Sequence, residues 1–285
     1  MADVSVLNVE LYGEAIGTLT RVPGDRSLFA FNEDYIESAD RPTLGLFFKD
    51  EFGDLRTEFK PVQKQVMPFF SNLFPEGHLR KYLAEQAGVN AEREFFLLWA
   101  LGRDLPGAIT IKPADGEIWP PEAAHVTGKD ASNPKDNMLR FSLAGVQLKF
   151  SAIEAASGGL TIPASGIGGN WIVKLPSRDY LGVPENEFSM MRLASMLGID
   201  VPRINLVDIE SIANLPDDTD RFGTKAFVIE RFDRRSSGDR VHIEDFTQVF
   251  GVYSEDKYKK ASMRNIATVI GAEGSDEDIR EFVRR

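Results

Sequence analysis

Over residues 1–62, hydrophobic and polar positions alternate in short runs that are typical of β-strands. The alternation at residues 6–11 stops at Gly13 and resumes at 15–19, which predicts a β-hairpin. Two further strands are predicted at 27–31 and 44–48. The chain therefore begins with a β-rich unit.

Helical periodicity replaces the alternation from residue 66 onward. In the segment 77–87, apolar residues recur at i, i+3, i+4 and i+8, and Gly88 follows as a helix stop. Asn90 is the predicted N-cap of a second helix, in which residues 95–101 are all apolar. A helix that is apolar on more than one face is expected to be buried. A strand is predicted after it, at 107–112.

The segment 113–138 has neither a strand period nor a helix period, and it contains four prolines. It is predicted to be a linker. The linker divides the chain into an N-terminal subdomain at 1–112 and a second unit at 139–285.

The second unit is predicted to contain strands, one helix and further strands. The strands are expected at 139–141, 147–153, 171–175, 204–209 and 225–230. The helix at 185–197 is expected to bury one apolar face, which consists of Met190, Leu193, Ala194 and Leu197. The order β-β-β-α-β-β is that of a protein-kinase N-lobe, an antiparallel sheet with one helix. The predicted fold class is therefore α+β, with a kinase-like N-lobe preceded by a small β-rich and helical N-terminal subdomain.

The overall composition is that of a globular protein, with 42% hydrophobic and 27% charged residues among 285. Apolar runs are short and the N-terminus is not basic, so neither a membrane span nor a secretory signal is predicted. A chain without cysteine fits a reducing compartment, and a cytoplasmic location is expected. The net charge of −11 argues against non-specific binding of nucleic acid, so any DNA contact is expected to come through a partner.

A candidate phosphate-binding loop lies between the first two strands of the second unit. Ala144 and Gly145 are small enough to let backbone N–H groups approach a phosphate, and Lys149 supplies a cation where the loop ends. The stretch lacks the G-x-G-x-x-G spacing, so an ordinary β-turn is the alternative interpretation.

Lys174 and Glu187 are a candidate ion pair. On the strand at 171–175, Lys174 points to the face opposite its apolar neighbours, where a lysine can reach nucleotide phosphates. Glu187 lies on the following helix, at a position from which it could pair with Lys174. The alternatives are a solvent-facing lysine and a first-turn acid that the helix dipole favours, a role for which Glu185 competes.

The strand at 225–230 runs into charged residues, which is the form of a kinase hinge. The backbone of Glu230 to Phe232 would then bind adenine, while Arg231, Asp233 and Arg234 could instead form salt bridges. No metal site is predicted, because the three histidines are scattered. The D-F-G-like Asp245-Phe246-Thr247 follows the hinge too closely to leave room for a catalytic loop, and is interpreted as coincidence.

Several blocks, in order along the chain, resemble the HipA family of serine/threonine kinase toxins. They are Phe74-Pro-Glu-Gly-His-Leu-Arg80, Leu101-Gly-Arg-Asp-Leu-Pro-Gly-Ala108, Ser142-Leu-Ala-Gly-Val-Gln-Leu-Lys149, Lys174-Leu-Pro176, Glu185-Asn-Glu187, Glu230-Arg-Phe-Asp-Arg234 and His242-Ile-Glu-Asp-Phe-Thr-Gln248. Several ordered matches are far less expected by chance than any single one.

This resemblance implies a set of roles. ATP, with Mg²⁺, would contact Ala144, Gly145, Val146, Gln147, Leu148, Lys149, Lys174, Glu230, Arg231 and Phe232. Ser142 would be the autophosphorylation site, where added charge would repel nucleotide phosphates. The family's typical targets are aminoacyl-tRNA synthetases, whose phosphorylation arrests growth. The implied partner is a small helix-turn-helix antitoxin of the HipB type, which would make the DNA contact.

The sequence departs from the family after the hinge. No D-x-x-x-x-N catalytic loop follows Glu230, and Asn265 is the only asparagine in that part. The catalytic Asp and the magnesium ligands are therefore expected beyond Arg285, and the chain is expected to be a fragment that lacks most of the C-lobe. The alternative hypothesis is a non-catalytic module that binds nucleotide or antitoxin.

Overall fold

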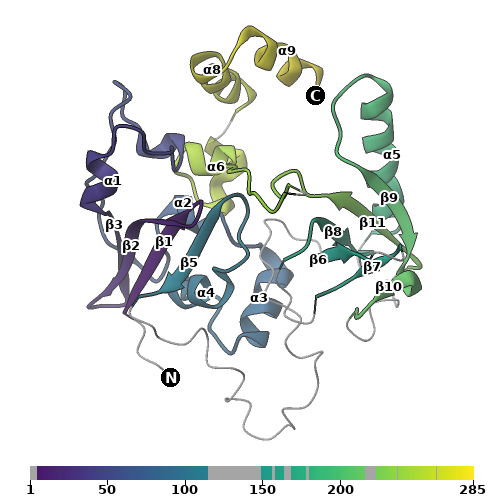
Figure 1. The fold of residues 1–285 in the computed structure, drawn as a ribbon, viewed down its shortest axis with the longest axis horizontal. Coiled ribbons are helices and arrows are strands. Elements are labelled where there is room, and N and C mark those ends of the chain that lie inside the picture. Colours follow the sequence, from purple (N-terminus) through teal and green to yellow (C-terminus); the bar gives the residue numbers. More distant parts are fainter. Residues whose placement is uncertain are drawn as a thin grey trace, which may run out of the picture.

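The computed structural model describes residues 5–114, 149–155, 158–163, 168–177, 180–215, 223–235, 237–260 and 262–285. The predicted strand at 139–141, the loop at 142–148 and most of the predicted linker lie outside these ranges. Within them, two mainly antiparallel sheets combine with helices, and the predicted α+β class is confirmed (Figure 1).

The first sheet has five strands in the order β4-β3-β2-β1-β5, all paired antiparallel. The strands are β1 (Val6–Leu11), β2 (Glu14–Val22), β3 (Arg26–Phe31), β4 (Val62–Gln63) and β5 (Ile109–Pro113). The predicted hairpin is β1–β2, and it turns at Tyr12 and Gly13, both with positive φ. Alternate residues of β1 point into the core, as the sequence pattern predicted.

Four helices accompany this sheet: α1 (Glu33–Glu37), α2 (Pro68–Ser71), α3 (Gly77–Gln86) and α4 (Glu94–Leu101). All eight residues of α4 are buried, which confirms the prediction made from its apolar sequence. Aromatic rings fill the space between sheet and helices. The rings of Phe29 and Phe70, for example, have their centroids 4.9 Å apart. Close packing of this kind accounts for the dense core of the N-terminal region.

The predicted strand at 44–48 is wrong. Leu44 and Phe48 are buried as the alternation required, but Leu46–Phe48 forms a 3₁₀ helix. The carboxylate of Glu244 accepts the backbone N–H of Leu46 at 2.9 Å, so a distant residue takes the donor that a sheet would have used.

The predicted N-cap at Asn90 is also wrong, because α4 begins at Glu94 with Arg93 as its N-cap. Asn90 Oδ1 instead accepts the N–H of Glu92 at 2.8 Å, which closes a local turn. Glu94 is fully buried and accepts hydrogen bonds from Val66 N and from Ser71 Oγ, both at 2.8 Å. These contacts tie the first residue of the helix to the core.

The second sheet has six strands in the order β10-β7-β6-β8-β11-β9, antiparallel except for the β10–β7 pair. The strands are β6 (Lys149–Glu154), β7 (Leu160–Thr161), β8 (Trp171–Lys174), β9 (Ile204–Asp208), β10 (Ile212–Ala213) and β11 (Lys225–Glu230). Gly169 between β7 and β8 has φ +112°, and a Cβ there would lie 2.5 Å from Ala152 O, so only glycine fits.

The helix α5 (Val183–Met196) lies beside β9 and β11 (Figure 1), but much of the face that was predicted to be buried is exposed. Met190, Leu193 and Leu197 are 53%, 47% and 65% exposed, so their expected burial is wrong, whereas Ala194 is half-buried. The half-buried residues of α5 are Val183, Glu187, Phe188, Met191 and Ala194, and Pro184 is buried. Glu187 pairs with Lys174 of the sheet, as described below.

The remaining helices follow the hinge: α6 (Phe246–Val249), α7 (Lys257–Lys260), α8 (Met263–Glu273) and α9 (Asp276–Arg284). The segment around α6 packs on the N-terminal region rather than on the second sheet. Asn72 Nδ2 donates to Val252 O at 2.8 Å, and Gln248 Nε2 donates to Phe69 O at 3.0 Å. The two halves of the sequence therefore share one interface.

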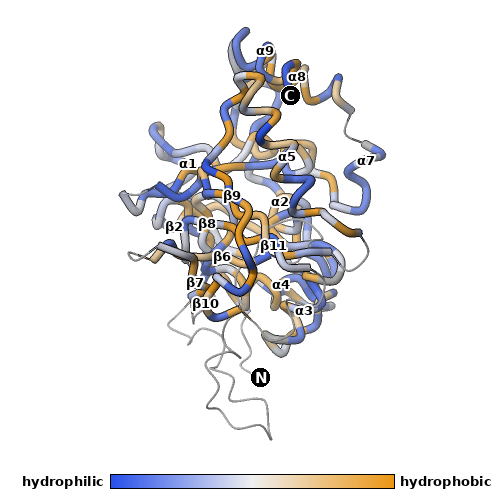
Figure 2. The backbone as a smooth tube through the Cα atoms, turned by 90° about the vertical axis from the view of Figure 1, so that its right-hand side faces the viewer, coloured by the Kyte–Doolittle hydropathy of each residue, from blue (hydrophilic) through white to orange (hydrophobic). Residues whose placement is uncertain are grey.

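Hydrophobic stretches run through the strands in the middle of the molecule (Figure 2). In the part of the chain that the structure describes, no helix combines the length and the apolar character needed to cross a membrane.

Candidate functional site

Three charged side chains meet on one face of the second sheet, and we call Lys149, Lys174 and Glu187 the lysine cluster. Lys149 on β6 and Lys174 on β8 are directly opposite each other in the strand register, so their side chains share a face. Lys174 Nζ and Glu187 Oε1 form an ion pair, and these side chains are 21% and 28% exposed. The helix α5 thus brings a carboxylate to two neighbouring lysines.

Lys149 is the more buried of the two lysines, at 7% exposure. Burial, and after it the positive charge of Lys174, lower the pKa of Lys149 from 10.5 to about 8, while Glu187 and Glu76 act in the opposite direction. Lys174 also lies 5.5 Å above the ring of Phe227 on β11. The cluster therefore holds more positive than negative charge in a partly desolvated place, which favours the binding of an anion.

The predicted hinge follows β11 directly. The Glu230 carboxylate accepts two hydrogen bonds from Arg203, at 2.8 and 2.9 Å, and these bonds lower the pKa of Glu230. The backbone N–H groups of Glu230 and Arg231 already donate to Arg203 O and Asn170 O, at 2.8 and 2.7 Å. Phe232 is 63% exposed, and within the described ranges neither its N–H nor its C=O has a hydrogen-bond partner. Of the predicted hinge residues, Phe232 is the one with an open backbone.

The charged residues of the hinge form what we call the buried charge network: Asp104, Arg231, Asp233 and Arg234. Arg231 donates to both carboxylate oxygens of Asp233, at 2.9 and 2.8 Å, and to Asp104 Oδ1 at 3.3 Å. Arg234 donates to Asp104 Oδ1 at 2.9 Å and to Asp233 Oδ2 at 2.8 Å. Burial alone would raise the pKa of Asp233, but the two arginines outweigh it and hold that pKa below its ordinary value. The side chain of Arg231 thus matches the salt-bridge alternative.

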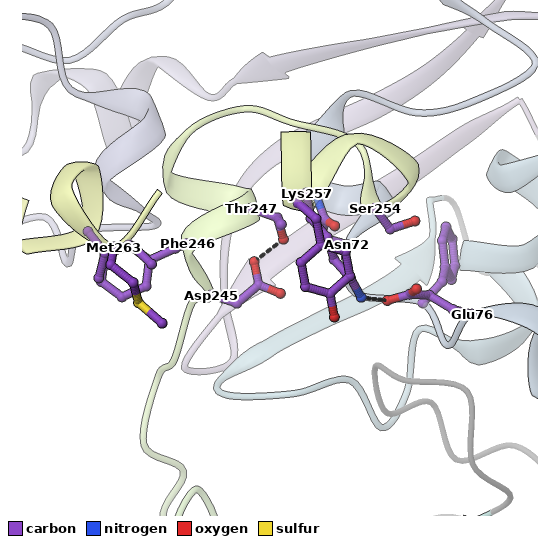
Figure 3. Close-up of a pocket in the computed structure, with 11 residues that line it drawn as sticks. Asn72, Glu76, Asp245, Phe246, Thr247, Ser254, Lys257 and Met263 are labelled. Atoms are coloured by element: carbon purple, nitrogen blue, oxygen red, sulfur yellow. Dashed lines mark hydrogen bonds and ion pairs between the residues drawn. The ribbon is translucent and has the colours of Figure 1, made fainter. Parts of the chain in front are cut away.

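A pocket of about 460 Å³ lies between the N-terminal region and the segment after the hinge (Figure 3). Its polar rim includes the ion pair between Glu76 Oε1 and Lys257 Nζ, 2.8 Å apart, and its apolar wall includes Phe246 and Met263. The negative charge of Glu76 also acts to raise the pKa of Lys149. Asp245, at its edge, caps α6 by accepting the N–H of Gln248 at 2.8 Å, which gives the D-F-G-like triplet a structural role.

The structure brings some predicted site residues together and leaves others undescribed. Lys149, Lys174 and Glu187 meet, and the hinge lies at the end of the neighbouring strand β11. Ser142 and the loop residues Ala144, Gly145, Val146, Gln147 and Leu148 lie outside the described residues. Among the described residues, no group of three or more His, Asp or Glu side chains gathers as a metal site.

Sequence reasoning did not single out three charged residues at this site: Glu76, Asp104 and Arg203. Glu76 and Asp104 lie in the two N-terminal blocks that resemble family signatures, and that resemblance was the available signal. Arg203 gave no signal, because its pairing with Glu230 depends on the register of β9 and β11.

Comparison with known proteins identifies the two halves separately. Residues 7–112 match the model of the HipA N-terminal domain, and residues 141–285 match the model of the HipA-like C-terminal domain. The putative kinase Y4dM of Sinorhizobium fredii is 55% identical over 287 residues, which cover 100% of this chain and 69% of that protein.

More distant relatives include a toxin. The serine/threonine-protein kinase toxin HipA of Shewanella oneidensis is 33% identical over 241 residues, covering 78% of this chain and 50% of the toxin. A solved complex of Shewanella oneidensis HipA, HipB and operator DNA contains a chain with 26% identity and a TM-score of 0.58. That match covers 94% of this chain and 62% of the other. The present chain thus spans between half and about two thirds of the length of these relatives.

Proposed function

This chain belongs to the HipA family, and we propose that it forms the ATP-binding part of a serine/threonine protein kinase from a type II toxin–antitoxin module. The observation that carries the proposal is the lysine cluster. Two lysines share one face of the sheet, and Glu187 from α5 pairs with one of them. A strand lysine paired with a glutamate of the following helix is the arrangement with which kinases hold the phosphates of ATP.

Each part of the site has a role in this proposal. Lys149 and Lys174 bind the phosphates, and Glu187 keeps Lys174 oriented toward them. The open backbone of Phe232 binds the edge of adenine, and the loop from Ala144 to Leu148 covers the phosphates. Mg²⁺ would arrive with the nucleotide and neutralise part of the phosphate charge. We assign it no protein ligand in this chain.

The wider biological role is inferred from the family. We propose autophosphorylation at Ser142, and a substrate from translation such as an aminoacyl-tRNA synthetase, with growth arrest as the consequence. The solved Shewanella complex, which holds HipA, HipB and operator DNA, supports a HipB-like antitoxin as partner and an indirect contact with DNA. The 33% identity to a kinase toxin supports the reaction class.

ATP binding tests the first half of the proposal. We expect this chain to bind ATP with Mg²⁺, and we expect Lys174→Ala to weaken binding at least about tenfold, because a phosphate contact is lost. Titration calorimetry measures both. Lys81→Ala, at an exposed lysine of α3, is the matched control and leaves the affinity unchanged. If wild-type chain binds no ATP, the proposal fails.

A test of phosphotransfer distinguishes the proposed kinase from the alternative, a non-catalytic module. The observation that favours the alternative is that no D-x-x-x-x-N loop follows Glu230. After incubation with ATP and Mg²⁺, mass spectrometry shows whether Ser142 carries phosphate, with Ser142→Ala as the control. Phosphate on Ser142 contradicts the module. ATP binding without any phosphate transfer is compatible with both, because no D-x-x-x-x-N loop follows Glu230 in this chain.

A further inference from the structure

The hinge presents one exposed residue between two buried ones. The side chains of Arg231 and Asp233 are 0% and 7% exposed, whereas Phe232 between them is 63% exposed. The backbone of both neighbours is held as well: Arg231 N donates to Asn170 O at 2.7 Å, and Val241 N donates to Asp233 O at 3.1 Å. Among the described residues, the Phe232 N–H and C=O have no hydrogen-bond partner, so this residue offers an open edge in a rigid frame.

Asp104 connects this frame to the N-terminal region. It lies between α4 and β5, is 1% exposed, and directs Oδ1 to Arg231 and Arg234. Its other oxygen, Oδ2, accepts the N–H of Gly168 at 2.9 Å. Gly168 leads into Asn170, whose carbonyl holds the backbone of Arg231. One carboxylate thus restrains the hinge by two routes, through the arginine side chains and through the loop before β8.

Further hydrogen bonds join the loop after Asp104 directly to the hinge. Arg234 Nη1 donates to Gly107 O at 2.8 Å, and Gly107 N donates to Asp233 Oδ2 at 2.9 Å, so the loop after Asp104 is joined to the hinge by reciprocal bonds. Two carboxylates face two guanidinium groups, and the network carries no net charge. A balanced and almost fully buried network has little freedom to rearrange.

From this geometry we propose that Asp104, although it belongs to the N-terminal region, is a positioning residue that sets the base selectivity of the nucleotide site. It does so by fixing the backbone of Phe232 through Arg231, Arg234 and the loop at Gly168. The inference rests on the proposed ATP site. A site built to hydrogen-bond one base edge rejects a base with the reversed donor and acceptor pattern, provided that its own groups are fixed. ATP is therefore preferred over GTP only while the network is intact.

The experiment compares three probes, ATP, GTP and inorganic tripolyphosphate, by titration calorimetry on this chain. Wild type is expected to prefer ATP over GTP at least about tenfold. Asp104→Asn removes the charge but keeps the shape, and we expect the ATP-to-GTP ratio to fall toward one while the affinity for tripolyphosphate is retained. Loss of folding stability alone would weaken ATP and tripolyphosphate together, so the ratio isolates positioning.

Two further variants keep the test decisive if Asp104→Asn does not fold. Arg231→Lys preserves the charge balance but loses the planar fork toward Asp233, and is expected to reduce the ATP-to-GTP ratio in the same way. Glu94→Gln is the matched control, because Glu94 is also a fully buried carboxylate that pairs with an arginine, Arg80, but makes no contact with the hinge network. It is expected to keep the wild-type ratio.

The outcomes are separable. A wild-type chain that binds no nucleotide contradicts the proposed function and this inference with it. Wild-type binding of ATP and GTP with equal affinity contradicts the inference alone. An unchanged ratio in folded Asp104→Asn or Arg231→Lys, or an equal loss of selectivity in Glu94→Gln, also overturns it.

Discussion

The buried charge network and the lysine cluster are both made of strong ions, but they differ in balance and in exposure. The network pairs two arginines with two aspartates, and its side chains are at most 12% exposed. The cluster sets two lysines against one glutamate, and its ion pair is more than a fifth exposed. The charges of the buried charge network are balanced by one another and are largely shielded from solvent. The lysine cluster retains positive charge that an anion can neutralise.

The buried charge network and the lysine cluster also differ in the type of cationic side chain that they use. Arg231 and Arg234 use several N–H groups each, in the fixed planar geometry that suits carboxylates on opposite sides. Lysine offers a single flexible ammonium group whose pKa responds to burial, as at Lys149. Charges that hold the architecture are thus arginines here, and charges proposed to receive phosphate are lysines.

The largest expected effect is on the network. Asp104→Ala leaves two buried guanidinium groups facing one carboxylate, and we expect the free energy of unfolding to fall by about 3–5 kcal/mol. Urea denaturation followed by circular dichroism measures it. If the free energy of unfolding fell no more than in a variant of an exposed surface residue, the distinction between the buried charge network and the lysine cluster would be contradicted.

Lys149→Met is expected to act in the opposite direction on stability. Removing a buried cation whose pKa is lowered to about 8 should raise the free energy of unfolding at neutral pH by on the order of 1–3 kcal/mol. The same variant should lose phosphate affinity, so stability and binding would separate. The control is Lys81→Met at an exposed position, with no change in either. Destabilisation by Lys149→Met would show that Lys149 holds the fold.

The pH dependence of ATP binding is a second test of the role of Lys149. The pKa of Lys149 is lowered from 10.5 to about 8, so the folded protein releases this proton before the unfolded chain does. Between these values the unfolded state binds more protons, and the contribution of Lys149 to stability therefore rises with pH. Affinity for ATP should fall over the lower part of that range, because the neutral amine no longer attracts phosphate. Calorimetry across that range measures the step, which Lys149→Met should abolish.

The smallest expected effect on stability is at the half-exposed ion pair. Glu187→Gln should lower the free energy of unfolding by less than about 1 kcal/mol, since solvent screens such pairs. It should nevertheless weaken ATP binding several-fold, because Lys174 loses its orienting partner. A stability loss as large as that of Asp104→Ala would contradict the comparison.

Local patterns predicted much of the fold and failed where distant groups intervened. The β1–β2 hairpin and the buried helix α4 followed from alternation and from an unbroken apolar run. The segment at 44–48 had the same alternation but became a 3₁₀ helix, because Glu244 takes the N–H of Leu46. The helix α5 was correctly placed in the chain, yet much of its apolar face is exposed.

Patterns along the chain were enough to predict the α+β class and the family, and to single out the two lysines and a hinge whose roles stay predictions. Those features depend on short-range periodicity and on motifs in a fixed order along the chain. The buried network in which Asp104, from before the predicted linker, joins Arg231 and Arg234 became evident from the folded chain alone. The reason is physical: a buried charge is stable only when opposite charges surround it, and those partners are chosen by proximity in space.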